Sequence, residues 1–222
     1  MDTVLVTGFG PYGNTPVNPA NQSAKALDGM TIAGARIVGV EVPSYWFKCI
    51  DSVVDAIKKN DPVMVIMMGE FGGRAMLTVE RIAQNINDST RYGLQDNDGL
   101  KQQGEPVVPT GPAAYYATLP LRAMVLAMRQ AGFPADISDA PGTLMCNHLM
   151  YGVLHHIETN RLPIRAGWIH LPSLPEIAAM DAFLGNPSMS LETTVGGLKV
   201  AIQAALEHEQ DIDAPVLSCW QI

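Results

Sequence analysis

The feature that most constrains the fold is a regular alternation of short apolar runs with segments of helical periodicity. The apolar runs are rich in β-branched residues and are typical of buried strands; they cover residues 4–7, 36–42, 63–68, 135–138 and 166–171. Helical patterns lie between and after them, in residues 19–27, 44–60, 120–132, 143–158 and 191–210. Such alternation indicates a mostly parallel sheet with helices on both faces. We therefore predict an α/β fold in one domain, residues 1–222.

The composition argues against several classes of function. The chain has 14 Lys and Arg against 22 Asp and Glu, a net charge of −8, which disfavours binding to nucleic acid. Its longest apolar run, residues 62–68, is too short to span a membrane. The first residues, MDTVLVTG, pass directly into a predicted strand without a signal-type segment, so we expect a cytoplasmic protein.

The loop after the first predicted strand contains GFGPYG, which matches the glycine pattern of dinucleotide-binding loops. In those loops a helix begins at once and directs its free N–H groups at the pyrophosphate. Here three prolines delay the helix until Asn18, a suitable N-cap, and the acidic residue expected about 20 positions later is missing. The segment is either a plain connection or one wall of a pocket. Phe9, Tyr12 and Asn18 would suit a small, neutral, flat ligand.

A cysteine is the best candidate for a nucleophile. Cys49, Cys146 and Cys219 are widely spaced and form no metal-binding pattern, so we expect free thiols and no metal site. Thr143 is a plausible N-cap, which would place Cys146 in the first turn of a helix. The free N–H groups and the dipole there favour a thiolate. The alternative is that Cys146 is a small buried apolar residue.

A cysteine nucleophile needs a proton carrier, and the candidates are the five histidines. Three share the helix of Cys146 but face away from it or lie too far along it, and a fourth lies in a charged helix end: His148, His155, His156 and His208. His170 ends the strand that follows this helix. A right-handed crossover would make the strands before and after the helix parallel, which brings the helix N-terminus and the strand end to one edge of the sheet. We therefore predict that Cys146 and His170 meet.

A third group should orient the histidine, and a carboxylate or an amide suits that task. The loops that follow the predicted strands should gather at one edge of the sheet. They bring four carboxylates there, among which spacing does not choose: Glu70, Glu80, Asp139 and Glu176.

Residues 78–109 fit the alternation less well. The part LTVERIAQNIND fits both the strand and the helix period, and we favour strand. The polar, turn-rich part that follows, residues 89–112, is of a length usually found in functional or mobile loops.

Four blocks resemble the pyrrolidone-carboxylate peptidase family, also called pyroglutamyl peptidase I: VTGFGPYGNTPVNPA, GEFGGRAMLTVERIAQNIND, DAPGTLMCNHLMYGVLHH and AGWIHLPSLPE. The likeness runs from about Thr3 to the last predicted helix. It implies a three-layer α/β/α sandwich similar to nucleoside phosphorylases, with a mostly parallel mixed sheet. It also implies a cysteine peptidase that removes N-terminal pyroglutamyl residues from peptides and uses neither a metal nor a cofactor.

The resemblance also assigns residues. It implies a catalytic triad of Cys146, His170 and Glu80, and Arg91 as a positively charged aid to the oxyanion. For the pyroglutamyl pocket it implies Phe9, Tyr12, Asn18, Leu144 and Met145. The chain departs from the family at Tyr12 and Leu144, where Phe is common, and at Glu70, where many members have an uncharged residue, often Gln. We predict that Glu70 binds substrate at the mouth of the pocket; its carboxylate would either repel acidic substrates or pair with Arg74.

Two other classes of function remain open at this point. A nucleoside or phosphate-ester enzyme on the same fold would need basic residues at the site, where Arg74 and Arg91 are the obvious ones. A binding protein without catalysis would tolerate loss of Cys146. The methionine-rich segment RAMVLAMRQ leads us to expect self-association, as a dimer or tetramer.

Overall fold

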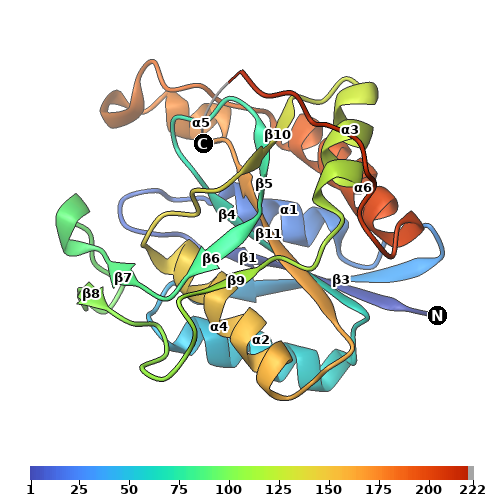
Figure 1. Ribbon diagram of the computed structural model, residues 1–222. Helices are drawn as coiled ribbons and strands as arrows, with labels where there is room; N and C mark the ends of the chain where they lie inside the picture. The colour runs from blue at the N-terminus through green and yellow to red at the C-terminus, as the bar shows by residue number, and fades with distance from the viewer. Residues whose placement is uncertain (220–222) are drawn as a thin grey trace.

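The computed structural model describes residues 1–219 and is built on a seven-stranded sheet (Figure 1). The strand order is β10-β5-β11-β4-β1-β3-β2. These strands are β1 Thr3–Phe9, β2 Thr31–Ile32, β3 Ala35–Val42, β4 Met64–Glu70, β5 Leu77–Glu80, β10 Ala135–Ser138 and β11 Arg165–Leu171. Two small ladders lie outside it, β6 Ile82–Gln84 with β9 Ala114–Tyr116, and β7 Asn87–Asp88 with β8 Gln103–Glu105. The preference for strand in the ambiguous part of residues 78–109 is confirmed.

Helices cover both faces of the sheet, as predicted. They are α1 Pro19–Leu27, α2 Lys48–Asn60, α3 Leu121–Gln130, α4 Met145–Thr159, α5 Pro175–Ala178 and α6 Leu191–Glu207, with 3-10 turns η1 Thr90–Tyr92 and η2 Asp181–Phe183. α1, α3 and α6 pack on one face, and α2 and α4 pack together on the other. Each face has its own buried apolar cluster. The expected three-layer α/β/α sandwich is confirmed.

The direction of β10 differs from the prediction. β1, β3, β4 and β11 are parallel, but β5 is antiparallel to β11 and β10 is parallel to β5. The strands before and after α4 therefore run in opposite directions, and the premise of a parallel crossover was wrong. The N-terminus of α4 still lies at the carboxyl end of β11, because the short connection of residues 160–164 folds this helix back along the strand that follows it.

Two helix starts also differ from the sequence pattern. α2 begins at Lys48 and not near residue 44, because Phe47 adopts a left-handed conformation, with φ of 62°. α4 is preceded by Leu144 at the N-cap and not by Thr143, whose hydroxyl donates to the carbonyl of Asp88 instead. The cap of α1 is as predicted: the Asn18 side chain accepts a hydrogen bond from Ala20 N.

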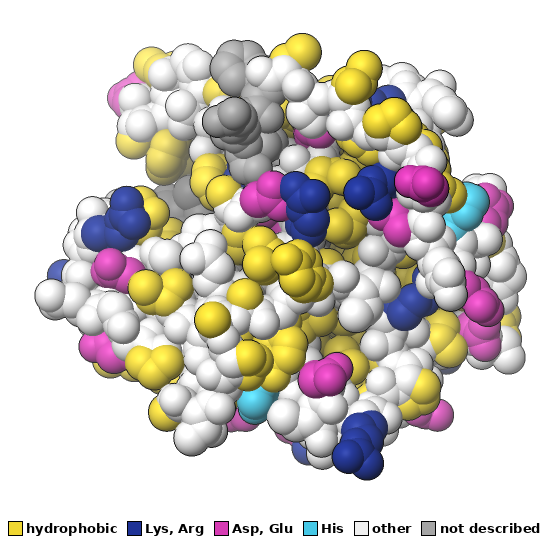
Figure 2. All heavy atoms as spheres, in the orientation of Figure 1, with side chains coloured by type: hydrophobic (Ala, Val, Ile, Leu, Met, Phe, Trp, Pro, Cys, Tyr) yellow, Lys and Arg dark blue, Asp and Glu magenta, His cyan; other side chains and the backbone are white. Residues whose placement is uncertain are grey.

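The argument for self-association from the methionine-rich segment was wrong. That segment forms α3, and the side chains of Met124 and Met128 lie fully buried between the sheet and α6. In the view of Figure 2, exposed apolar side chains lie instead over β6 and β9, where Tyr116 is 69% exposed. Within residues 1–219 the structure contains no helix long and apolar enough to cross a membrane.

Candidate active site

Cys146 lies at the start of α4, beside the carboxyl ends of the central strands. It is the second residue of the helix and is partly exposed. Its sulfur lies so close to β4 that a Cβ atom on Gly69 would be 2.8 Å from Sγ. Gly69 is also the register partner of His170 in the parallel ladder between β4 and β11. The thiol and the imidazole therefore adjoin the same glycine, although the parallel crossover from which their proximity was predicted is absent.

His170 is fixed by a carboxylate on its other side. Its Nδ1 lies 2.7 Å from Oε1 of Glu80, and both side chains are buried. The Phe71 ring meets the imidazole edge-on, with ring centroids 5.1 Å apart. The buried Nε2 has no hydrogen-bond partner among the described residues. The ring thus holds a proton on Nδ1 toward Glu80 and leaves Nε2 for the exchange of a proton with sulfur or substrate.

The four carboxylates that the sequence left open are now distinguished. Among them only Glu80 contacts His170 within residues 1–219. Asp139 forms an ion pair with Arg81 at the surface, Glu70 accepts a hydrogen bond from Ser173, and Glu176 is exposed on α5. The geometry agrees with the assignment that the resemblance implied.

Arg74 completes the buried network, a role that the sequence analysis missed. Its Nη1 donates to Oε1 of Glu80 at 2.7 Å and to the hydroxyl of Thr78 at 2.5 Å, and its Nη2 donates to the carbonyl of Ala140 at 3.0 Å. Its guanidinium stacks on the ring of Phe71, 3.8 Å from the centroid. The loop between β4 and β5 brings this arginine back over the end of the strand that carries Glu80.

These contacts set the ionisation of the site. Burial by itself would raise the pKa of Glu80, but the hydrogen bond and charge of His170 and the charge of Arg74 outweigh it and lower the pKa below its usual value. Burial lowers the pKa of His170 in spite of its bond to Glu80. Burial, assisted by the charge of Glu80, raises the pKa of the Cys146 thiol. The direction at Cys146 opposes the expected thiolate: burial favours the neutral forms of the thiol and the imidazole, whereas Glu80 favours its charged form.

The N-terminus of α4 offers donors for an oxyanion. Its N-cap, Leu144, has an apolar side chain, which cannot accept a hydrogen bond from the first N–H groups of the helix. The N–H of Cys146 belongs to this first turn, next to its own sulfur. A negative charge that develops on an atom bound to Sγ would lie close to these donors and to the positive end of the helix dipole.

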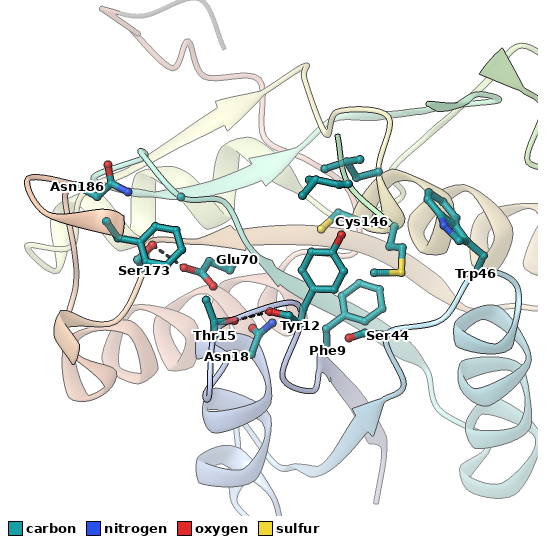
Figure 3. A pocket seen from close by; sticks show the side chains of 15 residues that line it. Phe9, Tyr12, Thr15, Asn18, Ser44, Trp46, Glu70, Cys146, Ser173 and Asn186 are labelled. Carbon is teal, nitrogen blue, oxygen red and sulfur yellow. Dashed lines mark hydrogen bonds between the residues drawn. The ribbon is translucent and has the colours of Figure 1, made fainter. Parts of the chain in front are cut away.

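A pocket of about 430 Å³ opens beside the sulfur (Figure 3). It is lined by Phe9, Tyr12, Thr15, Asn18, Ser44, Trp46, Glu70, Gly72, Leu94, Leu144, Met145, Cys146, Ser173, Phe183 and Asn186. All the pocket residues that the sequence analysis named are present except Arg91. Four lining residues that it missed are Ser44, Trp46, Leu94 and Ser173. Leu94 lies in the long polar segment and Ser173 in a loop after a strand, and both signals were visible in the sequence. Ser44 and Trp46 were missed because the sequence pattern placed them in a helix that in fact begins at Lys48.

Asn18 lines the pocket, and its amide group makes two hydrogen bonds within its own loop and helix start. Oδ1 accepts from Ala20 N at 3.0 Å, and Nδ2 donates to the carbonyl of Gly10 at 3.3 Å. One N–H and one oxygen lone pair of this amide remain, so pairing of Asn18 with a ligand stays a prediction. Tyr12 ties the same loop to the long polar segment, since its hydroxyl donates to the carbonyl of Gln95 at 2.8 Å.

Arg91 lies away from the pocket. It is exposed on η1, and its guanidinium lies over the Tyr92 ring, 4.9 Å from the centroid. It is absent from the described residues that line the pocket. A role for Arg91 at the oxyanion stays a prediction, and this arrangement gives it no support.

His148 and His155, also on α4, make hydrogen bonds away from the pocket and do not line it. His148 is fully buried, with Nδ1 3.0 Å from Oδ1 of Asn87 and Nε2 accepting from Phe47 N at 3.0 Å. Burial lowers its pKa to about 3, so it stays neutral. His155 bonds the hydroxyl of Tyr115. Within residues 1–219 the structure contains no group of three or more His, Cys, Asp or Glu placed to hold a metal ion.

Comparison with known proteins agrees with this site. A sequence model of one family, described as pyroglutamyl peptidase, matches residues 2–208. A pyrrolidone-carboxylate peptidase of Mycobacterium marinum is 62% identical over the full length of both chains, and one of Mycobacterium tuberculosis is 58% identical, also over the full length of both. The crystal structure of Bacillus amyloliquefaciens pyroglutamyl peptidase I is 38% identical and covers 96% of this chain and 100% of its own, with a TM-score of 0.91. The chain therefore belongs to the pyroglutamyl peptidase family of cysteine peptidases.

Proposed function

We propose that the chain removes N-terminal pyroglutamyl residues from peptides, with Cys146 as nucleophile, His170 as acid and base, and Glu80 as the group that orients His170. The observation that carries this proposal is the row from Glu80 through His170 to Gly69, against which the sulfur of Cys146 lies. Family membership supports the substrate, and the pocket beside the sulfur gives it a place to bind.

The first half of the reaction forms an acyl-enzyme. Because burial favours the neutral thiol and the neutral imidazole, Nε2 of His170 takes the sulfur's proton as Sγ attacks the carbonyl carbon of the pyroglutamyl residue. Glu80 stabilises the imidazolium that results. The N–H of Cys146 donates to the oxyanion; one such donor is typically worth about 3 kcal/mol. The C–N bond then breaks, the leaving amine takes the proton from His170, and a thioester remains.

The second half regenerates the thiol. Nε2 of His170 takes a proton from water, whose oxygen attacks the thioester carbon, and the C–S bond breaks. The proton returns to sulfur, and free pyroglutamate leaves. Each step uses only this chain's residues and water.

The pocket suits a lactam ring. Phe9 and Tyr12 supply aromatic surface for a flat, neutral ring, and Leu144 and Met145 add apolar surface next to the nucleophile. The ring N–H and C=O need partners from the backbone or from the remaining N–H and lone pair of Asn18. Proline lacks the ring carbonyl and would leave a donor unpaired, and sites of this kind discriminate strongly.

The test compares cysteine variants on a fluorogenic pyroglutamyl amide. Cys146→Ala should reduce kcat by at least about 10³-fold. Alkylation of the Cys146 thiol in the wild type should abolish turnover. Cys219→Ser is the matched control, because Cys219 is exposed and does not line the pocket; it should retain full activity. Activity that survives in folded Cys146→Ala would overturn the proposal.

We also propose a reducing compartment such as the cytoplasm. All three cysteines are free thiols in the structure, and reduced thiols persist in such a compartment. Self-association as a dimer or tetramer stays a prediction, which light scattering in solution would decide.

A further inference from the structure

The pocket extends to both sides of the nucleophile. Figure 3 shows the sulfur of Cys146 between two groups of lining residues, with Trp46 on one side. Glu70, Ser173 and Asn186 lie on the opposite side. A peptide whose carbonyl carbon meets the sulfur must place one residue on each side of it. The pocket therefore offers a position for the residue that follows the scissile bond as well as for the lactam.

The two sides differ in chemistry. The side near Trp46 carries its indole ring and the small hydroxyl of Ser44, with no charged group among the labelled residues (Figure 3). Leu144 and Met145, directly before Cys146 in the chain, add apolar lining to the pocket. The opposite side is polar and carries a carboxyl group. A neutral lactam ring suits the first side, because burial of apolar ring surface is favourable there. The leaving part of the peptide, which stays hydrated and chemically variable, is then directed toward Glu70.

Glu70 has no cationic partner in the described part of the chain. Among the described residues that line the pocket it is the sole Asp or Glu, and none is Lys, Arg or His. Its hydrogen-bond partner is the hydroxyl of Ser173, whose Oγ donates to Oε1 at 2.5 Å. The nearby cation in the sequence, Arg74, is engaged with Glu80 of β5. A carboxylate that is partly withdrawn from water and not paired gains from a cation that arrives with the substrate.

We propose that Glu70 sets specificity for the residue directly after the pyroglutamyl group, favouring Lys or Arg and disfavouring Asp or Glu. This inference rests on the proposed function, since it concerns the leaving side of the same reaction. In a partly desolvated site Glu70 attracts a cationic side chain and repels an anionic one. Both interactions therefore raise kcat/KM for the basic peptide relative to the acidic peptide.

The experiment measures kcat/KM at pH 8 for two dipeptide amides, pyroglutamyl-lysine amide and pyroglutamyl-glutamate amide. At this pH a carboxyl group is well above its ordinary titration range. The wild type should favour the lysine peptide by about fivefold or more. Glu70→Gln keeps the shape of the side chain and its bond to Ser173, and it should bring the ratio close to one. Glu176→Gln removes an exposed carboxylate outside the pocket lining and should leave the ratio as in the wild type.

A second measurement needs no variant. Burial raises the pKa of Glu70, opposed in part by its bond from Ser173, so its charge is lost as the pH falls. Because the carboxyl of the glutamate peptide titrates in the same range, this measurement compares the lysine peptide with the uncharged pyroglutamyl-glutamine amide. The other titratable groups that line the pocket, Tyr12 and Cys146, act on both substrates. The lysine preference should therefore shrink toward acidic pH.

The outcomes are distinct. A wild-type ratio near one, or an unchanged ratio in Glu70→Gln, overturns the role of Glu70. Loss of the preference in Glu176→Gln overturns it as well, because the preference would then reflect general surface charge. Failure of the folded wild type to cleave either peptide, and also the fluorogenic amide, overturns the proposed function itself.

Discussion

Nδ1 of His170 lies 2.7 Å from Oε1 of Glu80, and Arg74 Nη1 reaches the same oxygen at 2.7 Å. One carboxylate oxygen thus accepts from an imidazole and a guanidinium, with no more than 9% of any of the three side chains exposed. A buried carboxylate is tolerated because both partners favour its charged form. The imidazole is therefore held in one tautomer before substrate arrives.

We predict that Glu80→Gln lowers kcat by about 10³-fold or more, because a neutral amide cannot stabilise the imidazolium that forms during attack. KM should change much less, since Glu80 does not line the pocket. Steady-state kinetics check this, and Asp139→Asn serves as the control because that carboxylate pairs with Arg81 at the surface. A folded Glu80→Gln enzyme with near-normal kcat would contradict the triad.

For Arg74 the prediction concerns the pH profile. Its charge lowers the pKa of Glu80, His170 and Cys146, although for each of them burial or the contact within the triad is the larger influence. Removing the charge raises all three proton affinities, so the profile of kcat/KM for Arg74→Gln should move to higher pH.

Arg74→Lys keeps the charge and should hold the profile near its wild-type position, with a lower kcat because an ammonium cannot reproduce the forked contacts. A merely structural role would reduce the amount of active enzyme in both variants without moving the profile. Thermal unfolding gives the second readout: Arg74→Gln leaves the buried Glu80 with His170 but without its guanidinium partner, which should cost about 3 kcal/mol of stability.

The sequence was sufficient for those parts of the site that depend on local connections. Asn18 and Pro19 start α1 as predicted, and the short link from α4 to β11 places Cys146 near His170 whatever strand precedes the helix. The direction of β10 could not be predicted, because β5 separates it from β11 in the sheet. That pairing joins segments far apart in the chain, and no local pattern records it.

Other parts depend on burial, which a sequence does not give. The helix N-terminus favours a thiolate at Cys146, but loss of water around the sulfur has the larger effect and raises the pKa of the thiol. No sequence pattern indicated that Arg74 would pair with Glu80, because the two side chains meet only once the loop between β4 and β5 has folded. Asn18 caps its helix as predicted, and because capping uses one acceptor of its amide, ligand binding by the same side chain stays a prediction.

His148 should matter for stability and not for turnover. It is neutral in the folded protein, where burial lowers its pKa to about 3, whereas an unfolded histidine titrates near 6.5. As the pH falls below about 6.5 the unfolded chain takes up a proton that the folded chain refuses, so stability drops by up to about 1.4 kcal/mol per pH unit until the pH approaches 3.

His148→Gln should remove this contribution, because its amide does not titrate. Chemical denaturation of wild type and variant between pH 7 and pH 4 measures the difference, and kcat of the folded variant should stay within a few fold of wild type. A catalytic loss as large as that of His170→Ala, with folding intact, would contradict the geometry.

The last prediction concerns a cap supplied from far along the chain. α3 begins after Pro120, whose side chain cannot accept a hydrogen bond, and Asp211 takes that place: Oδ2 accepts from Arg122 N and Oδ1 from Ala123 N, both at 3.1 Å. A carboxylate at this position satisfies two N–H groups and interacts favourably with the helix dipole. Asp211→Ala should therefore reduce the free energy of unfolding by about 1–2 kcal/mol, and Asp211→Asn by less, since an amide oxygen still caps but carries no charge.

Asp213→Ala is the matched control, because Asp213 is exposed and makes no comparable contact among the described residues. Denaturant titration of the three variants checks the order. Equal stability of Asp211→Ala and Asp213→Ala would show that the segment after α6 contributes nothing to α3, and kcat/KM should be unchanged in all three because neither α3 nor this segment lines the pocket.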